Sequence, residues 1–198
     1  MSKDILVLYV SRYGSTELLA REVCKGIDGV KGTAARLRTV PAVSHVAEAS
    51  QDDVPAVGPP YASLQDLDEC AGLVMGSPTR FGNMDASLKY FLDSTTGAWM
   101  KGSLTDKPFG VFTSTSSLHG GAESTLLTMA IPLLHHGMVY VGLPYSEPAL
   151  TSTRGGGSPY GAGHVTFGRD GHDLSGDEKT LASKLGERVA RLAARLTD

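Results

Sequence analysis

Three short segments of this sequence combine hydroxyl, glycine and aromatic residues in a way that suits ligand binding. They cover residues 11–16 (SRYGST), 77–84 (SPTRFGNM) and 114–121 (STSSLHGG). Hydroxyl groups and free backbone N–H groups bind anions, and glycine lets the backbone come close to a ligand. Each segment directly follows a strand-like apolar run, which is where ligands bind in open α/β sheets. Together the segments predict one site built from three loops.

The segment 11–16 has the composition of a phosphate-binding turn. It offers three aliphatic hydroxyl groups and one glycine, and it leads into a helix-like stretch at 17–23 whose first N–H groups lack partners. Neither the Gly-Lys-[Ser/Thr] ending of a nucleoside-triphosphate loop nor the Gly-x-Gly-x-x-Gly dinucleotide pattern is present. Triphosphates and dinucleotides are therefore disfavoured at this turn. The alternative is an ordinary turn in which Ser15 caps the helix.

The other two segments suit the remainder of a flat ligand. In 77–84, proline, threonine, an aromatic ring and glycine follow a strand, which favours a heterocycle held along one edge by backbone hydrogen bonds. The alternative is a turn with Phe81 packed in the core. Five polar side chains and two glycines make 114–121 unsuitable as core, and the alternative there is a solvated loop. Three such loops after three strands favour a shared site over three coincidences.

The elements that must position these loops alternate between strand and helix. Proline sites within 41–60 predict a loop excursion, and Pro132 predicts a kink or break in its helix. Ser175 and Glu178 form a capping box that begins the last helix. Buried strands are predicted at 5–10 and 72–76, and further strands at 33–38, 109–113 and 138–141, the last strand. Helices are predicted at 17–23, 63–69, 84–92, 121–136 and from the capping box to 196.

Strand–helix alternation of this kind predicts an α/β fold, a doubly wound, five-stranded parallel sheet with helices on both faces. A length of 198 residues suits one domain spanning 1–198. Within it, the Gly/Pro-rich segment 142–176 is too long for a simple connection and predicts a loop at the active site or an interface.

Composition excludes several classes of protein. A formal net charge of −3 and the lack of a basic tract argue against nucleic-acid binding. Cys24 and Cys70 are far apart and form no CxxC motif, so neither a disulfide framework nor a zinc site is expected. No apolar stretch is long enough to span a membrane, and the N-terminus does not resemble a signal peptide. We expect a soluble protein of the cytoplasm.

The motifs SRYGST, SPTRFGNM and STSSLHGG, with LLHHGMVYVG at 133–142 and RGGGSPYGAG at 154–163, resemble one known family over nearly the whole chain. That family is the tryptophan-repressor-binding-protein (WrbA) type of flavodoxin-like NAD(P)H:quinone oxidoreductase. The resemblance implies a flavodoxin-like fold that binds FMN non-covalently. It also implies a homotetramer with active sites at subunit junctions.

The resemblance assigns roles to individual residues. Residues 11–16 should hold the FMN phosphate, Thr79, Arg80 and Phe81 should line the isoalloxazine ring, and 114–120 should approach its other edge and the ribityl chain. His136 should stand over the open face, Tyr13 where the nicotinamide nucleotide approaches, and Trp99 in the substrate pocket from a neighbouring subunit. The implied cofactor contacts are Ser11, Arg12, Tyr13, Gly14, Ser15, Thr16, Pro78, Thr79, Arg80, Phe81, Gly82, Asn83, Ser114, Thr115, Ser116, Ser117, Leu118, His119, Gly120 and His136.

The resemblance further implies the activity. NADH or NADPH would reduce FMN, and a quinone would then take two electrons at the same face and leave as the hydroquinone, in a ping-pong hydride mechanism. A one-electron flavodoxin-type carrier is one alternative, although such carriers are usually more acidic. A non-catalytic protein that binds a partner and affects transcription is another, but no recognition helix or basic patch supports it.

Two predicted site residues have alternatives of their own. His136 could donate a proton to the reduced quinone, or it could only stack against the substrate. The adjacent residues His135 and His136 point in different directions, which disfavours a shared metal. The pair His119 and His136 has no carboxylate or cysteine at close spacing, so no metal is expected. Trp99 is either a core residue or, in a stretch predicted to lack helix between Gly97 and Gly102, an interface or pocket residue.

Overall fold

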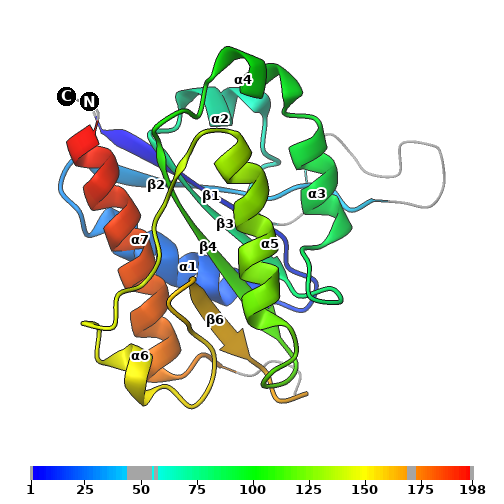
Figure 1. Ribbon diagram of the computed structural model, residues 1–198, viewed down its shortest axis with the longest axis vertical. Coiled ribbons are helices and arrows are strands. Elements are labelled where there is room, and N and C mark those ends of the chain that lie inside the picture. The colour runs from blue at the N-terminus through cyan, green and yellow to red at the C-terminus, as the bar shows by residue number, and fades with distance from the viewer. Residues whose placement is uncertain (1, 44–54, 56–57, 169–172, 197–198) are drawn as a thin grey trace.

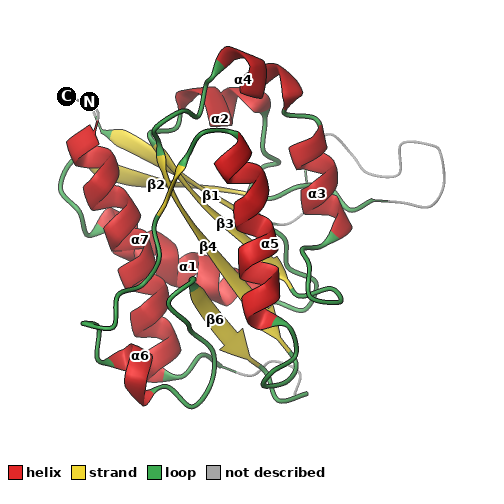
Figure 2. Ribbon diagram, viewed as in Figure 1, coloured by secondary structure: helices red, strands yellow, loops and turns green. Residues whose placement is uncertain are grey.

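The computed structural model describes residues 2–43, 55, 58–168 and 173–196. A central parallel sheet lies between two layers of helices, as Figure 1 and Figure 2 show. The predicted α/β architecture with helices on both faces is confirmed. The loop excursion predicted for 41–60 falls largely outside the described residues.

Six strands form this sheet in the part of the chain that the structure describes. Their order is β2-β1-β3-β4-β5, with β6 also beside β4, and every pair is parallel. Residues 5–8 of β1 are completely buried, as expected for an apolar strand covered on both faces. The bounds are β1 Lys3–Tyr9, β2 Thr33–Arg38, β3 Gly72–Pro78, β4 Pro108–Thr115, β5 Val139–Tyr140 and β6 Ala162–Val165.

Seven helices cover the sheet among the described residues. Their bounds are α1 Ser15–Asp28, α2 Leu64–Glu69, α3 Ala86–Asp93, α4 Thr96–Lys101, α5 Ala122–His135, α6 Ala149–Ser152 and α7 Gly176–Leu196. Helices α1, α6 and α7 pack on one face, and α2, α3 and α5 pack on the other. No helix in the described ranges is both long and apolar enough to cross a lipid bilayer.

Alternation along the strands divides the interior into two cores. In β1, Ile5 and Val7 pack toward α1 and α7, whereas Leu6 and Leu8 pack toward α3 and α5. Successive side chains of a strand point to opposite faces, so one apolar run supplies both cores. The sheet is held rigidly from both sides, and its strand ends are fixed platforms for the loops that follow them.

The segment 142–176 is not the simple loop that its glycines and prolines suggest. It contains α6 and a strand, β6, so the prediction that 138–141 forms the last strand is wrong. β5 pairs with the first two residues of β4, and β6 pairs with Phe112–Thr115 further along it. Two separate pieces of chain thus share one position in the sheet. Close backbone contact explains the glycines: a Cβ on Gly161 would lie 2.1 Å from the carbonyl oxygen of Val111.

Glu178 attaches β6 to the start of α7. The predicted capping box is present, because Ser175 N donates to Glu178 Oε2 at 2.8 Å and Glu178 N donates to Ser175 Oγ at 3.2 Å. The same carboxylate accepts from Gly156 N at 2.9 Å and Val165 N at 3.1 Å, and lies 3.1 Å from His164 Nδ1. Burial by itself would raise the pKa of Glu178, but these hydrogen bonds lower it to about 2.

Two further expectations differ from the structure. Helix α5 continues past Pro132 to His135, so the predicted break is not present. Trp99 lies in helix α4, not in a helix-free stretch. The two glycines that suggested loop there have local roles, because Gly102 ends α4 with φ +67° and Gly97 lies within it.

Candidate functional site

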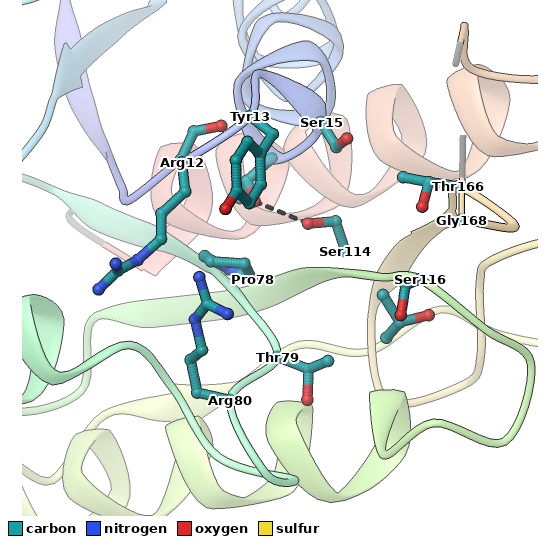
Figure 3. Close-up of a pocket in the computed structure, with 13 residues that line it drawn as sticks. Arg12, Tyr13, Ser15, Pro78, Thr79, Arg80, Ser114, Ser116, Thr166 and Gly168 are labelled. Carbon is teal, nitrogen blue, oxygen red and sulfur yellow. Dashed lines mark hydrogen bonds between the residues drawn. The ribbon is translucent and has the colours of Figure 1, made fainter. Parts of the chain in front are cut away.

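A pocket of about 250 Å³ lies at the carboxyl ends of β1, β3 and β4. All three polar loops reach it, as expected for an open parallel sheet. Figure 3 shows their side chains converging from separate elements. Its described lining consists of Ser11, Arg12, Tyr13, Ser15, Thr16, Pro78, Thr79, Arg80, Ser114, Thr115, Ser116, Thr166 and Gly168.

The first loop has the features of an anion cradle. Gly14, with φ +88°, is the N-cap of α1 and supplies no side-chain acceptor, so the first N–H groups of α1 face outward without one. Ser15 is the first residue of α1 and not its N-cap, so the capping role considered for Ser15 is wrong. Ser11 Oγ is buried and has no hydrogen-bond partner among the described residues. Thr16 Oγ1 lies 2.8 Å from Ser114 Oγ and joins this loop to the third one.

The second loop forms a tight reverse turn at the pocket rim. Arg80 N donates to Asn83 O at 2.7 Å, and Asn83 N donates back to Arg80 O at 3.0 Å. Phe81 and Gly82 between them have φ +53° and +76°, the left-handed pair of a type I′ turn. Phe81 is fully exposed at the tip, so the alternative that it packs in the core is wrong. Residues other than glycine with a strained backbone of this kind cluster at functional sites, and Phe81 is one of them.

The third loop divides into a buried and an exposed part. Ser114 and Thr115 are the buried end of β4, and together with Ser116 they line the pocket. Residues 117–120 are exposed and lie outside the described lining. Thr79 N donates to Ser114 O at 2.9 Å, so the second and third loops are bonded to each other as well.

One wall of the pocket comes from residues that the sequence motifs did not indicate. Thr166 and Gly168 line it from the end of β6, where Thr166 N donates to Thr115 O at 2.9 Å. The four residues of β6 are too few to show a periodic pattern, and the nearby glycines suggested loop instead. The capping box that follows at Ser175 indicated only where the next helix begins.

Asp85 lies behind the pocket and contacts both arginines that line it. Arg12 Nε donates to Asp85 Oδ2 at 2.7 Å, and Arg80 Nε lies 3.7 Å from the same oxygen. Asp85 Oδ1 accepts from Ser87 N at 3.0 Å and so caps α3. Burial alone would raise the pKa of Asp85, but the bonds from Arg12 and Ser87 keep it below its ordinary value. The carboxylate is therefore ionised at neutral pH.

Trp99 and His136 do not meet the pocket of their own chain. The pocket is at the Gly121 end of α5, whereas His136 follows the other end of this 14-residue helix, about 20 Å away. His136 is buried, its Nε2 lies 2.9 Å from Thr95 Oγ1, and burial and then His135 lower its pKa. Trp99 is half exposed and donates from Nε1 to His135 O at 2.8 Å. These two residues form a separate cluster.

Comparison with known proteins identifies relatives of the whole chain. The NADPH-dependent FMN reductase family matches residues 4–147. A protein of Chromohalobacter salexigens named NAD(P)H dehydrogenase (quinone) is 44% identical over 206 residues, covering 99% of both chains. One of the same name from Geobacter sulfurreducens is 40% identical over 202 residues, covering 98% of both.

Solved structures give the same fold. A WrbA-like flavodoxin from Agrobacterium tumefaciens superimposes with a TM-score of 0.70 at 23% identity, covering 99% of this chain and 100% of the other. A flavodoxin from the domain Archaea gives 0.64 at 17% identity, covering 96% and 99%. These likenesses confirm the flavodoxin-like topology.

Proposed function

The chain belongs to the NADPH-dependent FMN reductase family, with NAD(P)H dehydrogenase (quinone) relatives along its full length, and from this premise we propose that it reduces quinones with electrons from NADH or NADPH through a non-covalently bound FMN. The observation that carries the proposal is the anion cradle of the first loop. A buried Ser11 hydroxyl without a partner and an uncapped helix start suit a monophosphate.

The donor set of the pocket fits FMN rather than a metal. Hydroxyl groups, backbone N–H groups and Arg12 suit the phosphate, and the exposed ring of Phe81 suits a flat heterocycle. In the described part of the chain, no three His, Cys, Asp or Glu residues gather as metal ligands would. We assign 11–16 to the phosphate, 78–83 to the ring, and 114–120 to the ribityl chain and the other edge.

FMN, when bound, supplies the hydride acceptor and two-electron donor that the side chains lack. The protein holds the phosphate end in the first loop and presents Phe81 and Tyr13, both largely exposed, at the rim. We assign Tyr13 to the approach of the nicotinamide nucleotide. Because one open side serves both substrates, they bind in turn, and the reaction is ping-pong. Steady-state rates should give parallel double-reciprocal lines for NADH and benzoquinone, and intersecting lines would contradict a shared face.

FMN binding is the direct test of the cradle. The purified protein should bind FMN, and Ser11→Ala should weaken the affinity about tenfold, because one charge-assisted hydrogen bond contributes about 1.5 kcal/mol. Ser94→Ala, which removes an exposed hydroxyl far from the lining, is the matched control. Fluorescence titration of FMN measures both. A wild-type chain that binds no FMN, or a Ser11→Ala variant that binds as tightly as Ser94→Ala, would reject this assignment.

We further propose that His136 and Trp99 complete the pocket of another subunit within a homotetramer. Their distance from their own pocket requires a second copy if they are to contact substrate. An exposed apolar stripe along α5, formed by Leu127, Ile131 and Leu134, supports association, since contiguous exposed apolar surface marks sites of interaction. Light scattering should give four chains per particle, and a monomer with full quinone turnover would overturn this assignment.

A further inference from the structure

The charge of the pocket comes from two residues that share one buried partner. Among the thirteen described residues that line it, Arg12 and Arg80 alone carry a formal charge at neutral pH. Arg12 belongs to the first loop and Arg80 to the second. Both guanidinium groups contact Oδ2 of Asp85, at 2.7 Å and 3.7 Å. Asp85 thus contacts both of the residues that give the described lining its formal charge.

Because the Asp85 carboxylate is buried, its charge is screened less by water than the charges of Arg12 and Arg80. The Asp85 side chain is 1% exposed, whereas those of Arg12 and Arg80 are 51% and 41% exposed. Water screens the two arginines, while the carboxylate acts through the protein interior, where screening is weak. Figure 3 shows Arg12 and Arg80 on the same side of the pocket, away from Thr166 and Gly168. The three groups form a local charge cluster on one flank of the pocket.

We propose that Asp85 is a positioning residue that sets the positive charge facing the bound cofactor, by holding Arg12 and Arg80 and offsetting one of their two charges. The inference rests on the proposed function, because it concerns the FMN of that pocket. Asp85 lies behind the arginines and not in the described lining, so it acts through them. It also bonds the first loop to the start of α3, which fixes the distance between the phosphate cradle and the ring-binding turn.

This arrangement has a measurable electrostatic consequence. Reduction of FMN by two electrons and one proton adds one negative charge to the cofactor, so nearby positive charge favours the reduced form. Asp85 opposes that effect by offsetting one arginine. Removing its charge should therefore strengthen binding of the reduced cofactor relative to the oxidised one and raise the midpoint potential. Solvent screening of the arginines limits the change to about tenfold in that ratio, or about 30 mV for a two-electron couple.

Asp85→Asn removes the negative charge of this side chain but keeps its role as the N-cap of α3. Asparagine caps helices as well as aspartate does, so α3 keeps its N-cap and the side chain keeps its shape. Asp66→Asn is the matched control, because Asp66 is also a buried, helix-capping carboxylate between two arginines and lies outside the described lining. We expect dye-equilibration titrations under anaerobic conditions to show a raised potential for Asp85→Asn and an unchanged one for Asp66→Asn.

A second variant makes the test independent of Asp85→Asn folding. Arg80→Gln removes one positive charge while Arg12 keeps its bond to Asp85, so the potential should fall instead of rise. An unchanged potential in both Asp85→Asn and Arg80→Gln, or an equal rise in Asp66→Asn, would overturn the inference. If the wild type binds no FMN, the proposed function fails first. If it binds FMN and reduces quinones while Asp85→Asn and Arg80→Gln both keep the wild-type potential, only this inference fails.

Discussion

Asp66 and Asp85 are two buried carboxylates with the same surroundings and different tasks. Asp66, in α2 just before β3, lies 3.3 Å from both Arg36 and Arg38. Asp85, just after β3, contacts Arg12 and Arg80. Each carboxylate also helps to cap a short helix. A buried carboxylate that contacts two arginines therefore occurs both before and after strand β3.

The difference lies in what the arginines do next. Arg36 is also bonded to Asp4 and Glu69, so the Asp66 cluster is a closed network in which acids surround the bases. The arginines of the Asp85 cluster are about twice as exposed and line the pocket. The comparison indicates that a carboxylate–arginine cluster stabilises the fold where its charges balance one another. Where the arginines carry more charge than the carboxylate offsets, the same kind of cluster gives a binding site positive charge.

Glu178 is a third buried carboxylate, and its loss should have the largest effect on the free energy of unfolding. Its partners include three backbone N–H groups, and its pKa falls from 4.5 to about 2 in the folded chain. Glu178→Gln should lower the free energy of unfolding by about 3 kcal/mol, since one pKa unit corresponds to about 1.4 kcal/mol. It should also weaken FMN binding, because β6 carries Thr166. Urea denaturation against Glu187→Gln, on the more exposed face of the same helix, tests this. Equal losses in the two variants would contradict it.

Asp66→Ala should come next. The change removes the α2 capping box and leaves Arg36 and Arg38 without their shared partner. We expect a loss of about 2 kcal/mol in the free energy of unfolding, with FMN affinity unchanged. Asp68→Ala, an exposed change in the same helix, should cost less than about 0.5 kcal/mol. Weakened FMN binding in Asp66→Ala would break the division of tasks between the two clusters.

Acid should act on both clusters in the same direction. The pKa values of Asp66 and Asp85 are both lowered in the folded chain: burial raises them, and hydrogen bonds from Ser63 to Asp66 and from Arg12 to Asp85 more than offset it. The unfolded chain therefore binds more protons, so this part of the stability is present above about pH 4 and is lost as pH falls through the folded values. The urea concentration at the unfolding midpoint should decrease as the pH is lowered below 4. The decrease should be less steep in Asp66→Asn and Asp85→Asn. A slope equal to wild type in both variants would contradict this.

The smallest expected change in stability is at the pocket rim. Phe81 adopts φ +53° with its ring in solvent, so Phe81→Gly should leave the fold as stable or about 0.5 kcal/mol more stable. Quinone turnover should nevertheless fall several-fold, because the aromatic surface is lost. Asparagine also tolerates the backbone conformation of this turn, so Phe81→Asn is the matched variant. It should show a similar stability and a similar loss of turnover. A clear loss of stability in both would show that the ring packs in the folded protein.

Sequence patterns predict the centre of this protein better than its edge. Long apolar runs such as 5–10 and a capping box at Ser175 identify buried strands and a helix start because local residues determine them. β6 could not be predicted in the same way, because its pairing depends on contact with β4, which lies about fifty residues earlier in the chain. The three loops are predictable because they follow recognisable strands.

The charge cluster behind the pocket shows a different limit. Arg12 lies 73 residues before Asp85, and although Arg80 is close to Asp85 in sequence, nothing in their spacing indicates that one buried oxygen contacts both arginines. His136 and Trp99 show the same limit, because their place at the far end of α5 follows from the length of that helix. Sequence motifs indicate which residues matter, and only the packed sheet determines which of them meet.

The sharing of one sheet position by β5 and β6 also bears on aggregation. Unpaired edges of sheets can recruit strands from other molecules, and long, flat, uncharged edges are the most hazardous. Here one edge consists of fragments of two and four residues, too short to serve as a template. The opposite edge, β2, carries the charged side chains of Arg36 and Arg38 and their acidic partners, and charged side chains along an edge disfavour pairing with another chain. Among the described residues, the edge made by β5 and β6 thus offers no long, flat row of backbone groups with which a strand of another molecule could pair.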